Sequence, residues 1–217
     1  MSILLRACLC LLAGVFVLAA NVAFAADDVR FDAARVVEYL NQLNAFSARF
    51  SQTRYDETGV EIEQSNGECQ VHRPGRFRWT YLEPYAQTIV SNGRQLWIYD
   101  VDLEQVTRNE VEAIGTDSPA ALLGQDIDVE SHFEIRAVRH EESWSWFDLI
   151  PKSEQRDFSV VELGFNGGEI EAMRLRDNLG QATLIRFSDL DRTAVIDQAE
   201  FEFQIPVGVD VLEGGVP

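Results

Sequence analysis

Apolar residues recur with a helical period in one early stretch of the chain and with a two-residue period along most of the remainder. Val36, Leu40 and Leu43 are spaced i, i+4 and i+7, which predicts an amphipathic helix over 33–44 with Asp32 as its N-cap. After this helix, apolar and polar residues alternate in short runs, as in strands with one buried face. These runs predict strands at about 46–51, 60–72, 76–82, 86–91, 95–100, 103–108, 131–139, 144–150, 158–165, 169–176, 182–189 and 200–205.

Turn sequences that contain glycine separate several of these strands. Asn92-Gly93, Asn166-Gly167-Gly168 and Asn178-Leu179-Gly180 are typical of the turns that join antiparallel neighbours. A short second helix is expected at 117–124, where Ser118-Pro119 suits the N-cap and the first helical position. It is too short to be stable alone, so it must lie against another apolar surface. The predicted fold class is mainly β with a few helices, built on one curled antiparallel sheet.

The first 25 residues are typical of a secretory signal peptide. Arg6 precedes an apolar run, and Ala23-Phe24-Ala25 matches the small-x-small pattern at which such peptides are cleaved. The alternative is a membrane anchor, which is disfavoured because the run is short and is closed by Asn21 and by acidic residues. We therefore expect a cleaved signal peptide at 1–25 and one domain at 26–217.

The cysteines predict neither a disulfide nor a lipid anchor. Cys8 and Cys10 leave with the signal peptide, and neither follows the small-residue box at which lipoproteins are processed. Cys69 is then the single cysteine, so no intramolecular disulfide can form. Such a residue is more often a small buried hydrophobe than a reactive thiol. The mature protein is accordingly expected to be soluble.

The composition is that of a folded domain with a strong acidic excess. Of the 217 residues, 46% are hydrophobic and 25% are charged, which is close to the average of globular proteins. The 36 acidic and 18 basic residues give a net charge of −18. This charge argues against nucleic-acid binding, because phosphate backbones recruit basic surfaces. A docking partner is expected to be basic.

Residues that could carry catalysis or hold a cofactor are few and scattered. The chain has three histidines and lacks the metalloprotease, nucleophile-elbow, phosphate-loop and paired-cysteine zinc motifs. Asp100 and Asp102 lack the remaining ligand spacing of a calcium loop. Two distant carboxylates could still converge as a glycosidase pair, so a secreted hydrolase remains a rival hypothesis. We expect no enzyme activity, no metal and no cofactor.

Large apolar side chains alternate on consecutive strands between residues 65 and 106. An ordinary β core would explain them, and so would a curled sheet whose aromatic concave face forms an apolar cavity capped by small helices. Arg73 precedes Pro74, which marks a strand end because proline lacks a ladder donor. Arg73 is either a surface charge or a hydrogen-bond donor to the carbonyls of a covering helix. The alternating residues are Val71, Phe77, Trp79, Tyr81, Ile89, Trp97 and Tyr99.

Several motifs in this stretch and around it resemble those of the LolA family of periplasmic lipoprotein carriers. They occur in the family's order over nearly the whole mature chain, and together they are specific although each is weak alone. The motifs are Phe46-x-x-x-Phe50-x-Gln52, Arg73-Pro74-Gly75-Arg76-Phe77-Arg78-Trp79, Ser91-Asn92-Gly93 followed by Leu96-Trp97-Ile98-Tyr99-Asp100, Ser118-Pro119 with Leu122-Leu123, and Ala199-x-Phe201-x-Phe203-x-x-Pro206.

The resemblance implies an incomplete, unclosed antiparallel β-barrel covered by a helical lid. It implies a periplasmic chaperone that holds the acyl chains of lipoproteins in an apolar cavity. Such carriers take lipoproteins from an inner-membrane ABC transporter complex and pass them to an outer-membrane receptor. Arg73 matches the family's latch arginine, which holds the lid closed, and we expect the protein to act as a monomer. The residues assigned to acyl-chain binding are Leu40, Leu43, Phe50, Val71, Phe77, Trp79, Ile89, Trp97, Leu122 and Leu123.

The chain departs from the family pattern at two places in the second lid helix. Ala120-Ala121 is smaller than the bulky pair often found there, and Gly124 costs about 1 kcal/mol of helix propensity relative to alanine. Both features lead us to expect a looser lid. The nearest alternative function is a lipid or glycolipid shuttle on the same fold, because an apolar cavity selects ligands by the length of their acyl chains more than by their head groups.

Overall fold

All residues that the computed structural model describes belong to one compact unit, residues 31–217. They are residues 32–111, 123–124, 128–141, 143–153 and 158–214. The expected signal peptide at 1–25 and most of the helix expected at 117–124 therefore lie outside the described residues. Leu123 and Gly124 are the described part of that helix, and both are helical.

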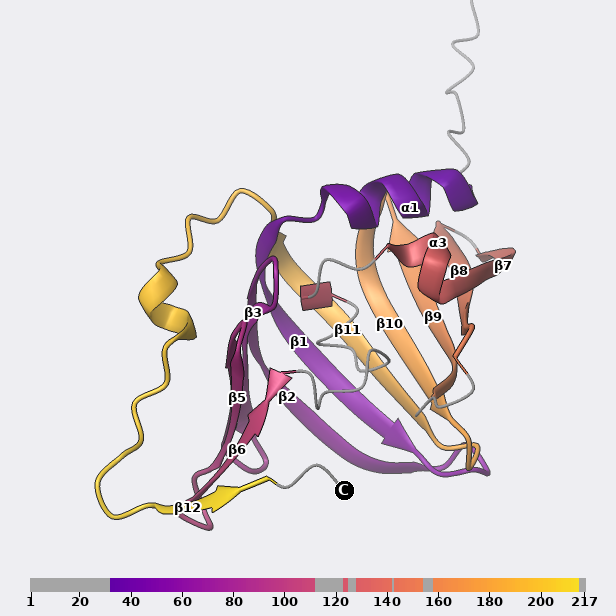
Figure 1. Ribbon diagram of the computed structural model, residues 1–217. Coiled ribbons are helices and arrows are strands. Elements are labelled where there is room, and N and C mark those ends of the chain that lie inside the picture. Colours follow the sequence, from indigo (N-terminus) through magenta and orange to yellow (C-terminus); the bar gives the residue numbers. More distant parts are fainter. Residues whose placement is uncertain (1–31, 112–122, 125–127, 142, 154–157, 215–217) are drawn as a thin grey trace, which may run out of the picture. The chain divides into compact units, whose positions relative to one another are not determined.

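Twelve strands in the described part of the chain form a single sheet (Figure 1). Their order across the sheet is β12-β6-β5-β4-β3-β2-β1-β11-β10-β9-β8-β7, so β12 and β7 are its two edges. Neighbouring strands are antiparallel, except that β12 runs parallel to β6. The strands are β1 (Ala45–Tyr55), β2 (Glu61–His72), β3 (Arg76–Glu83), β4 (Gln87–Asn92), β5 (Gln95–Asp100), β6 (Gln105–Glu110), β7 (Phe133–Glu141), β8 (Trp144–Pro151), β9 (Phe158–Asn166), β10 (Glu169–Asp177), β11 (Ala182–Asp191) and β12 (Asp210–Glu213).

Two helices and the helical residues Leu123 and Gly124 lie against this sheet, and we call these described segments the cover. In α1 (Ala33–Gln42) the Asp32 carboxylate accepts a hydrogen bond from the backbone N–H of Arg35, as the N-cap prediction requires. The short α3 (Val129–His132) leads into β7 and contacts α1. Within the described ranges, no helix is both long enough and apolar enough to cross a membrane. The predicted fold class, a mainly β protein with a large unclosed sheet and a helical cover, is confirmed.

The two faces of the sheet have different roles, which strand β9 illustrates. Val161, Leu163 and Phe165 belong to the main hydrophobic core, together with buried residues of α1 and with Leu123. We call this side the interior face. Glu162 and Gly164 alternate with them and therefore belong to the opposite side, which we call the outer face.

The strand predicted at 200–205 is wrong. The structure has a 3₁₀ helix, η2 (Gln198–Phe201), followed by irregular backbone, and the last strand is β12. Phe201 is fully buried, and Phe203 stacks on Trp97 with ring centroids 6.2 Å apart. The alternating phenylalanines thus pack a segment against the sheet instead of forming a strand in it. Arg78 satisfies part of this backbone by donating from Nε to the carbonyl of Glu200 at 2.8 Å.

Candidate functional site

Aromatic side chains from neighbouring strands pack together on the interior face. The ring centroid of Phe50 on β1 lies 4.8 Å from that of Trp79 and 5.1 Å from that of Tyr81, both on β3. Gly67, the β2 residue paired with Phe50, makes room for this contact. A Cβ atom at Gly67 would come within 2.8 Å of the Phe50 ring and 2.0 Å of the Thr80 carbonyl oxygen. The result is a continuous apolar surface across β1–β3.

Three leucines from helical segments shield this surface from solvent. Leu40 on α1, Leu43 at its C-cap and Leu123 are at most 1% exposed. All three belong to the same buried cluster as Phe77 and Trp79. Exposing an apolar surface to water costs roughly 25 cal/mol per Å², so the cover stabilises the closed arrangement.

Arg73 joins the two covering segments to the turn between β2 and β3. Its guanidinium donates from Nε to the carbonyl of Leu123 at 2.9 Å and from a terminal nitrogen to the carbonyl of Leu40 at 2.5 Å. The Leu40 carbonyl lies in the last turn of α1, where the helix dipole favours a cation, and it also accepts a hydrogen bond from the backbone N–H of Leu43 at 3.4 Å. Arg73 therefore makes the contacts with covering helices that the resemblance implied, and it is not a solvated surface charge.

The turn that carries Arg73 is itself fixed by backbone and side-chain hydrogen bonds. Gly75 donates from its N–H to the carbonyl of Gly124 at 2.8 Å, which adds a third link to the cover. The buried Ser91 hydroxyl donates to the Gly75 carbonyl at 2.6 Å and accepts from the N–H of Gly93 at 3.2 Å. The second turn, at Asn92-Gly93, thus supports the first and holds Arg73 in place.

Gly124 has a different role from the one expected from its helix propensity. A Cβ atom at this position would lie 3.1 Å from Cδ1 of Phe77, tighter than an ordinary van der Waals contact. The absence of a side chain therefore lets the second covering segment approach the Phe77 ring closely. The structure gives Gly124 a packing role at the cover, whereas the sequence suggested only a loosened helix.

Most of the residues assigned to acyl-chain binding come together on the interior face. The exceptions are Leu122, which lies outside the described residues, and Trp97, which packs with Val90 and Val106 in a separate cluster. Leu96 and Ile98 take the interior positions on β5 that the sequence analysis gave to Trp97 and Tyr99. The assigned residues that share the main core are Leu40, Leu43, Phe50, Val71, Phe77, Trp79, Leu123 and, partly buried against it, Ile89.

The sequence missed Leu96 and Ile98 because β5 is apolar on both faces. In the run Leu96-Trp97-Ile98-Tyr99 every residue is apolar or aromatic, so alternation does not identify the buried face. The pairing with β4 identifies the buried face, because Ile98 lies opposite Ile89 and Trp97 lies opposite Val90. In the structure the ring of Phe203 packs against Trp97 and Tyr99, which identifies these two residues as the outer-face pair of β5.

A family model described as "Outer membrane lipoprotein carrier protein LolA" matches residues 41–204. The chain belongs to the LolA family. Two curated relatives carry the name outer-membrane lipoprotein carrier protein. The one from Methylococcus capsulatus is 42% identical over 82% of this chain and 86% of its own length. The one from Nitrosomonas europaea is 35% identical over 91% and 97%.

A solved structure shares the fold at low sequence identity. It is the crystal structure of an uncharacterized conserved protein from Thermus thermophilus, with a TM-score of 0.50 and 12% identity over 84% of this chain and 100% of that chain. The family model and the curated relatives confirm the resemblance found in the sequence at the level of the family. LolA-family proteins are named as carriers, not as enzymes.

Cys69 and one of the histidines of this LolA-family chain pack against other side chains of the fold. Cys69 is buried in the main core, and burial raises the pKa of its thiol to about 12, so it stays protonated. His72 lies on β2 with its ring 6.2 Å from that of Phe201, and its Nδ1 lies 3.1 Å from both a terminal nitrogen of Arg76 and the carbonyl oxygen of Arg73. Among the described residues, no group of histidine, cysteine and carboxylate side chains could hold a metal ion.

Gly124→Val is expected to loosen the cover of this LolA-family chain. A valine would drive its Cβ and methyl groups into the Phe77 ring, and overpacking of this kind costs about 1–3 kcal/mol. We expect an apolar fluorophore to enter the interior face faster than in the parent, measured by stopped-flow fluorescence. Gly124→Ala, with a smaller clash, should give a smaller increase. Unchanged entry rates in both variants would contradict the packing role of Gly124.

Proposed function

We propose that this chain is a periplasmic carrier that binds the acyl chains of lipoproteins against its interior face. It would take lipoproteins from an inner-membrane ABC transporter complex and deliver them to an outer-membrane receptor, acting as a monomer without a cofactor. The observation that carries the proposal is the buried aromatic face of β1–β3 under a cover that one arginine ties down. The name shared by the relatives, outer-membrane lipoprotein carrier protein, supports it.

Transfer energies explain why lipoprotein transport needs a carrier. A C16 acyl chain has about 15 methylene and methyl units at roughly 0.8 kcal/mol each, so keeping one chain in water costs about 12 kcal/mol. A lipoprotein with two or three chains would leave a membrane far too slowly without help. The apolar side chains beneath the cover, Phe50, Phe77 and Trp79 among them, offer the chains a surface of matching chemistry.

A carrier without cargo would expose its apolar interior face to water, and the cover prevents this exposure. Without cargo, Leu40, Leu43 and Leu123 occupy the interior face and shield it. With cargo, acyl chains would take their place, and the hydrogen bonds of Arg73 would have to break. Charge-assisted hydrogen bonds contribute about 1.5–3 kcal/mol each, which is small compared with the transfer energy of one chain. Cargo can therefore open the cover, and closure can still favour its release.

A photocrosslinking experiment tests this proposal. A photoreactive phenylalanine analogue is placed at Trp79, on the interior face, and as a matched control at Trp97, a buried tryptophan on the outer face. After irradiation in living cells, we expect lipoproteins bound covalently at position 79 and none at position 97, identified by mass spectrometry. Phospholipid or glycolipid adducts alone at position 79 would favour the rival shuttle. Equal lipoprotein adducts at both positions would contradict binding on the interior face.

A further inference from the structure

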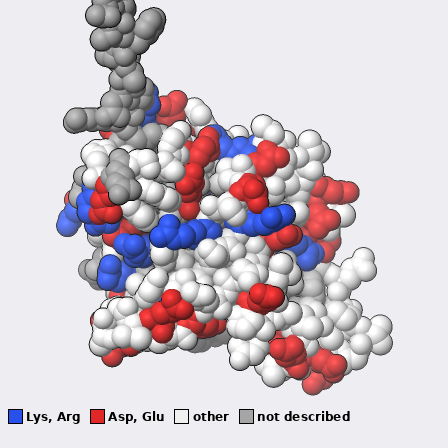
Figure 2. Space-filling view, turned by 180° about the vertical axis from the view of Figure 1, so that it is seen from behind, with Lys and Arg blue, Asp and Glu red and all other residues white. Residues whose placement is uncertain are grey.

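The outer face of β7–β11 carries a group of arginines in a chain of strong acidic excess. We call it the arginine face. Figure 2 shows basic side chains gathered in a band across the side of the molecule opposite to the view of Figure 1. The arginine face comprises Arg139, Arg174, Arg176 and Arg186, the carboxylates Asp148 and Glu162, and the aromatic residues Trp144 and Trp146.

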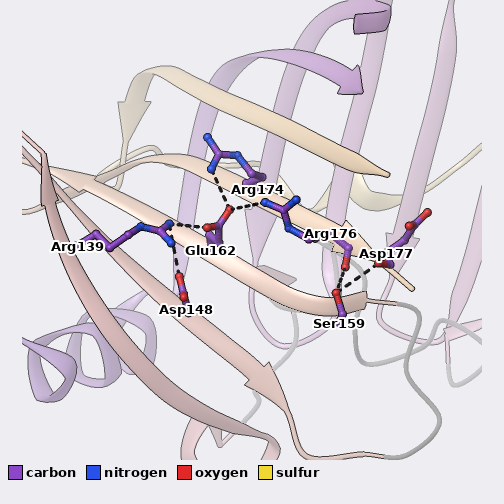
Figure 3. Close-up of polar contacts among 7 residues, drawn as sticks. All are labelled: Arg139, Asp148, Ser159, Glu162, Arg174, Arg176 and Asp177. Carbon is purple, nitrogen blue, oxygen red and sulfur yellow. Dashed lines mark hydrogen bonds and ion pairs between the residues drawn. The ribbon is translucent and has the colours of Figure 1, made fainter. Parts of the chain in front are cut away.

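A buried carboxylate holds three of these arginines in place (Figure 3). The Glu162 side chain is 5% exposed, and its oxygens lie 2.5 Å from Arg139, 3.0 Å from Arg174 and 4.0 Å from Arg176. Burial by itself raises the pKa of Glu162, but hydrogen bonds from Arg139 and Arg174 outweigh it and keep that pKa below its ordinary value. Glu162 is therefore ionised and fixes the guanidinium groups over β7, β9 and β10.

Aromatic rings support the guanidinium groups from below. Trp144 and Trp146 are stacked, with ring centroids 5.5 Å apart and planes 15° from parallel. Arg174 lies 5.1 Å over the ring of Trp146, and Arg186 lies 6.0 Å over the ring of Trp144. Gly164, the β9 residue paired with Trp146, leaves room for that ring, since a Cβ atom there would come within 2.9 Å of it.

The arginine face keeps hydrogen-bonding capacity for a partner. The side chains of Arg139, Arg174 and Arg176 are between 31% and 46% exposed, and a guanidinium carries five donors. Within the face, four guanidinium groups meet two carboxylates, so the face is locally positive. Glu141, at the end of β7, adds a negative charge at its margin, and Arg136 and Glu134 form an ion pair without net charge farther along the same strand. The net charge predicts a basic partner, whereas this local distribution fits an acidic group.

Rigid arginines over tryptophans suit a protein partner better than a bilayer. Binding of a protein costs less side-chain entropy when the contacting groups are already held, and tryptophan and arginine are the residues enriched at interface hot spots. An anionic bilayer would be repelled by the remainder of a chain with net charge −18. Carboxylates of a single protein segment can instead contact the face alone, two oxygens to one guanidinium.

We propose that the arginine face docks an acidic segment of a partner protein. This surface is separate from the acyl-chain site, because Glu162 and Arg174 lie on the outer face while their neighbours Leu163 and Met173 lie in the main core. A partner bound there would leave Arg73 and the cover free to move. The proposal therefore does not depend on the function proposed above.

Two arginines of the face allow a test that keeps the two short ion pairs of Glu162, because Arg176 lies 4.0 Å from this carboxylate and Arg186 contacts Trp144. Arg139 and Arg174 are kept, because they make the short contacts to this buried carboxylate. The variant is Arg176→Gln with Arg186→Gln, and the matched control is Arg35→Gln with Arg94→Gln, two exposed arginines on α1 and after β4. Both double variants change the net charge by the same amount. The binding of an apolar fluorophore should be unchanged in both, and urea unfolding should show that both remain folded under the conditions of the titration.

The probe is a peptide of ten glutamates, titrated into the protein at about 0.01 M and about 0.15 M salt. We expect the NMR signals of the arginine Nε–H groups on this face to shift, and the affinity of the Arg176/Arg186 variant to fall about tenfold. The control should bind like the parent. An equal loss of peptide affinity in both double variants would show that net charge alone determines binding, and it would overturn the proposal. Binding to phosphatidylglycerol vesicles that depends on Arg176 and Arg186, without peptide binding, would overturn it in favour of a membrane surface.

Discussion

Arg73→Leu is expected to give a carrier that loads readily but releases its cargo slowly. The substitution removes the hydrogen bonds to Leu40 and Leu123 and keeps apolar bulk near the backbone. Their loss should lower the stability of the closed state by at least about 3 kcal/mol, or roughly 150-fold in the closed-to-open ratio. Because closure no longer opposes the loaded open state, capture from transporter-containing membranes should rise and hand-off to receptor-containing membranes should fall. Both steps can be measured separately with a labelled lipoprotein.

Two further substitutions separate the latch from a general effect of charge. Arg73→Lys keeps the charge but lacks the planar fork, so release should be intermediate. Arg78→Leu is the matched control, because Arg78 also donates to a backbone carbonyl, that of Glu200, but not to the cover. It should release cargo like the parent. Release by Arg73→Leu at the parent's rate would show that Arg73 is not a latch, whatever its contacts.

Phe77→Glu is expected to abolish binding of an apolar fluorophore to the interior face. Phe77 is 1% exposed and lies against Gly124 in the cover. A carboxylate without a partner costs several kcal/mol in an apolar environment, so an acyl chain or a dye should no longer find a matching surface. The measurement is the fluorescence of a polarity-sensitive dye, together with its displacement by a lipopeptide.

Phe201→Glu is the matched control for this prediction. Phe201 is equally buried but is the last residue of η2, which packs against β3 and β4. Both variants should lower the free energy of unfolding, whereas only Phe77→Glu should lose dye binding. Circular dichroism and urea unfolding establish that both proteins are folded at the temperature used. Dye binding by a folded Phe77→Glu protein at parental affinity would rule out an acyl site at this position.

Local features of the fold followed from the sequence because their causes are local. The spacing of Val36 and Leu40 and the carboxylate of Asp32 place α1 to within two residues, since helical period and capping act over one or two turns. Turn positions followed from glycines: Gly93 and Gly180 have φ values of +90° and +88°, which residues with a side chain rarely adopt. Because these local turns end the strands, most strand boundaries agree with the prediction to a few residues.

Features that depend on contacts between distant segments required the tertiary structure. The apolar residues on both faces of β5 left two choices of interior side, and only the pairing with β4 and the packing of Phe203 on Trp97 decide between them. The alternation at 200–205 indicated a strand, but a strand needs a free edge, and these phenylalanines pack against a face of the sheet.

The candidate site also has some features that follow from the sequence and others that depend on the tertiary structure. The sequence by itself determined that an arginine stands before Pro74, that aromatic residues alternate on the strands around it, and that a helix with an apolar side precedes them. Only the tertiary structure decided what Arg73 meets, because the carbonyls of Leu40 and Leu123 are 33 and 50 residues away along the chain. It also decided the role of Gly124, whose cost to the helix is local but whose benefit, close contact with Phe77, arises only when the cover lies on the sheet. Propensity and alternation are properties of neighbouring residues, whereas the contacts of Arg73 join chain segments that only folding brings together.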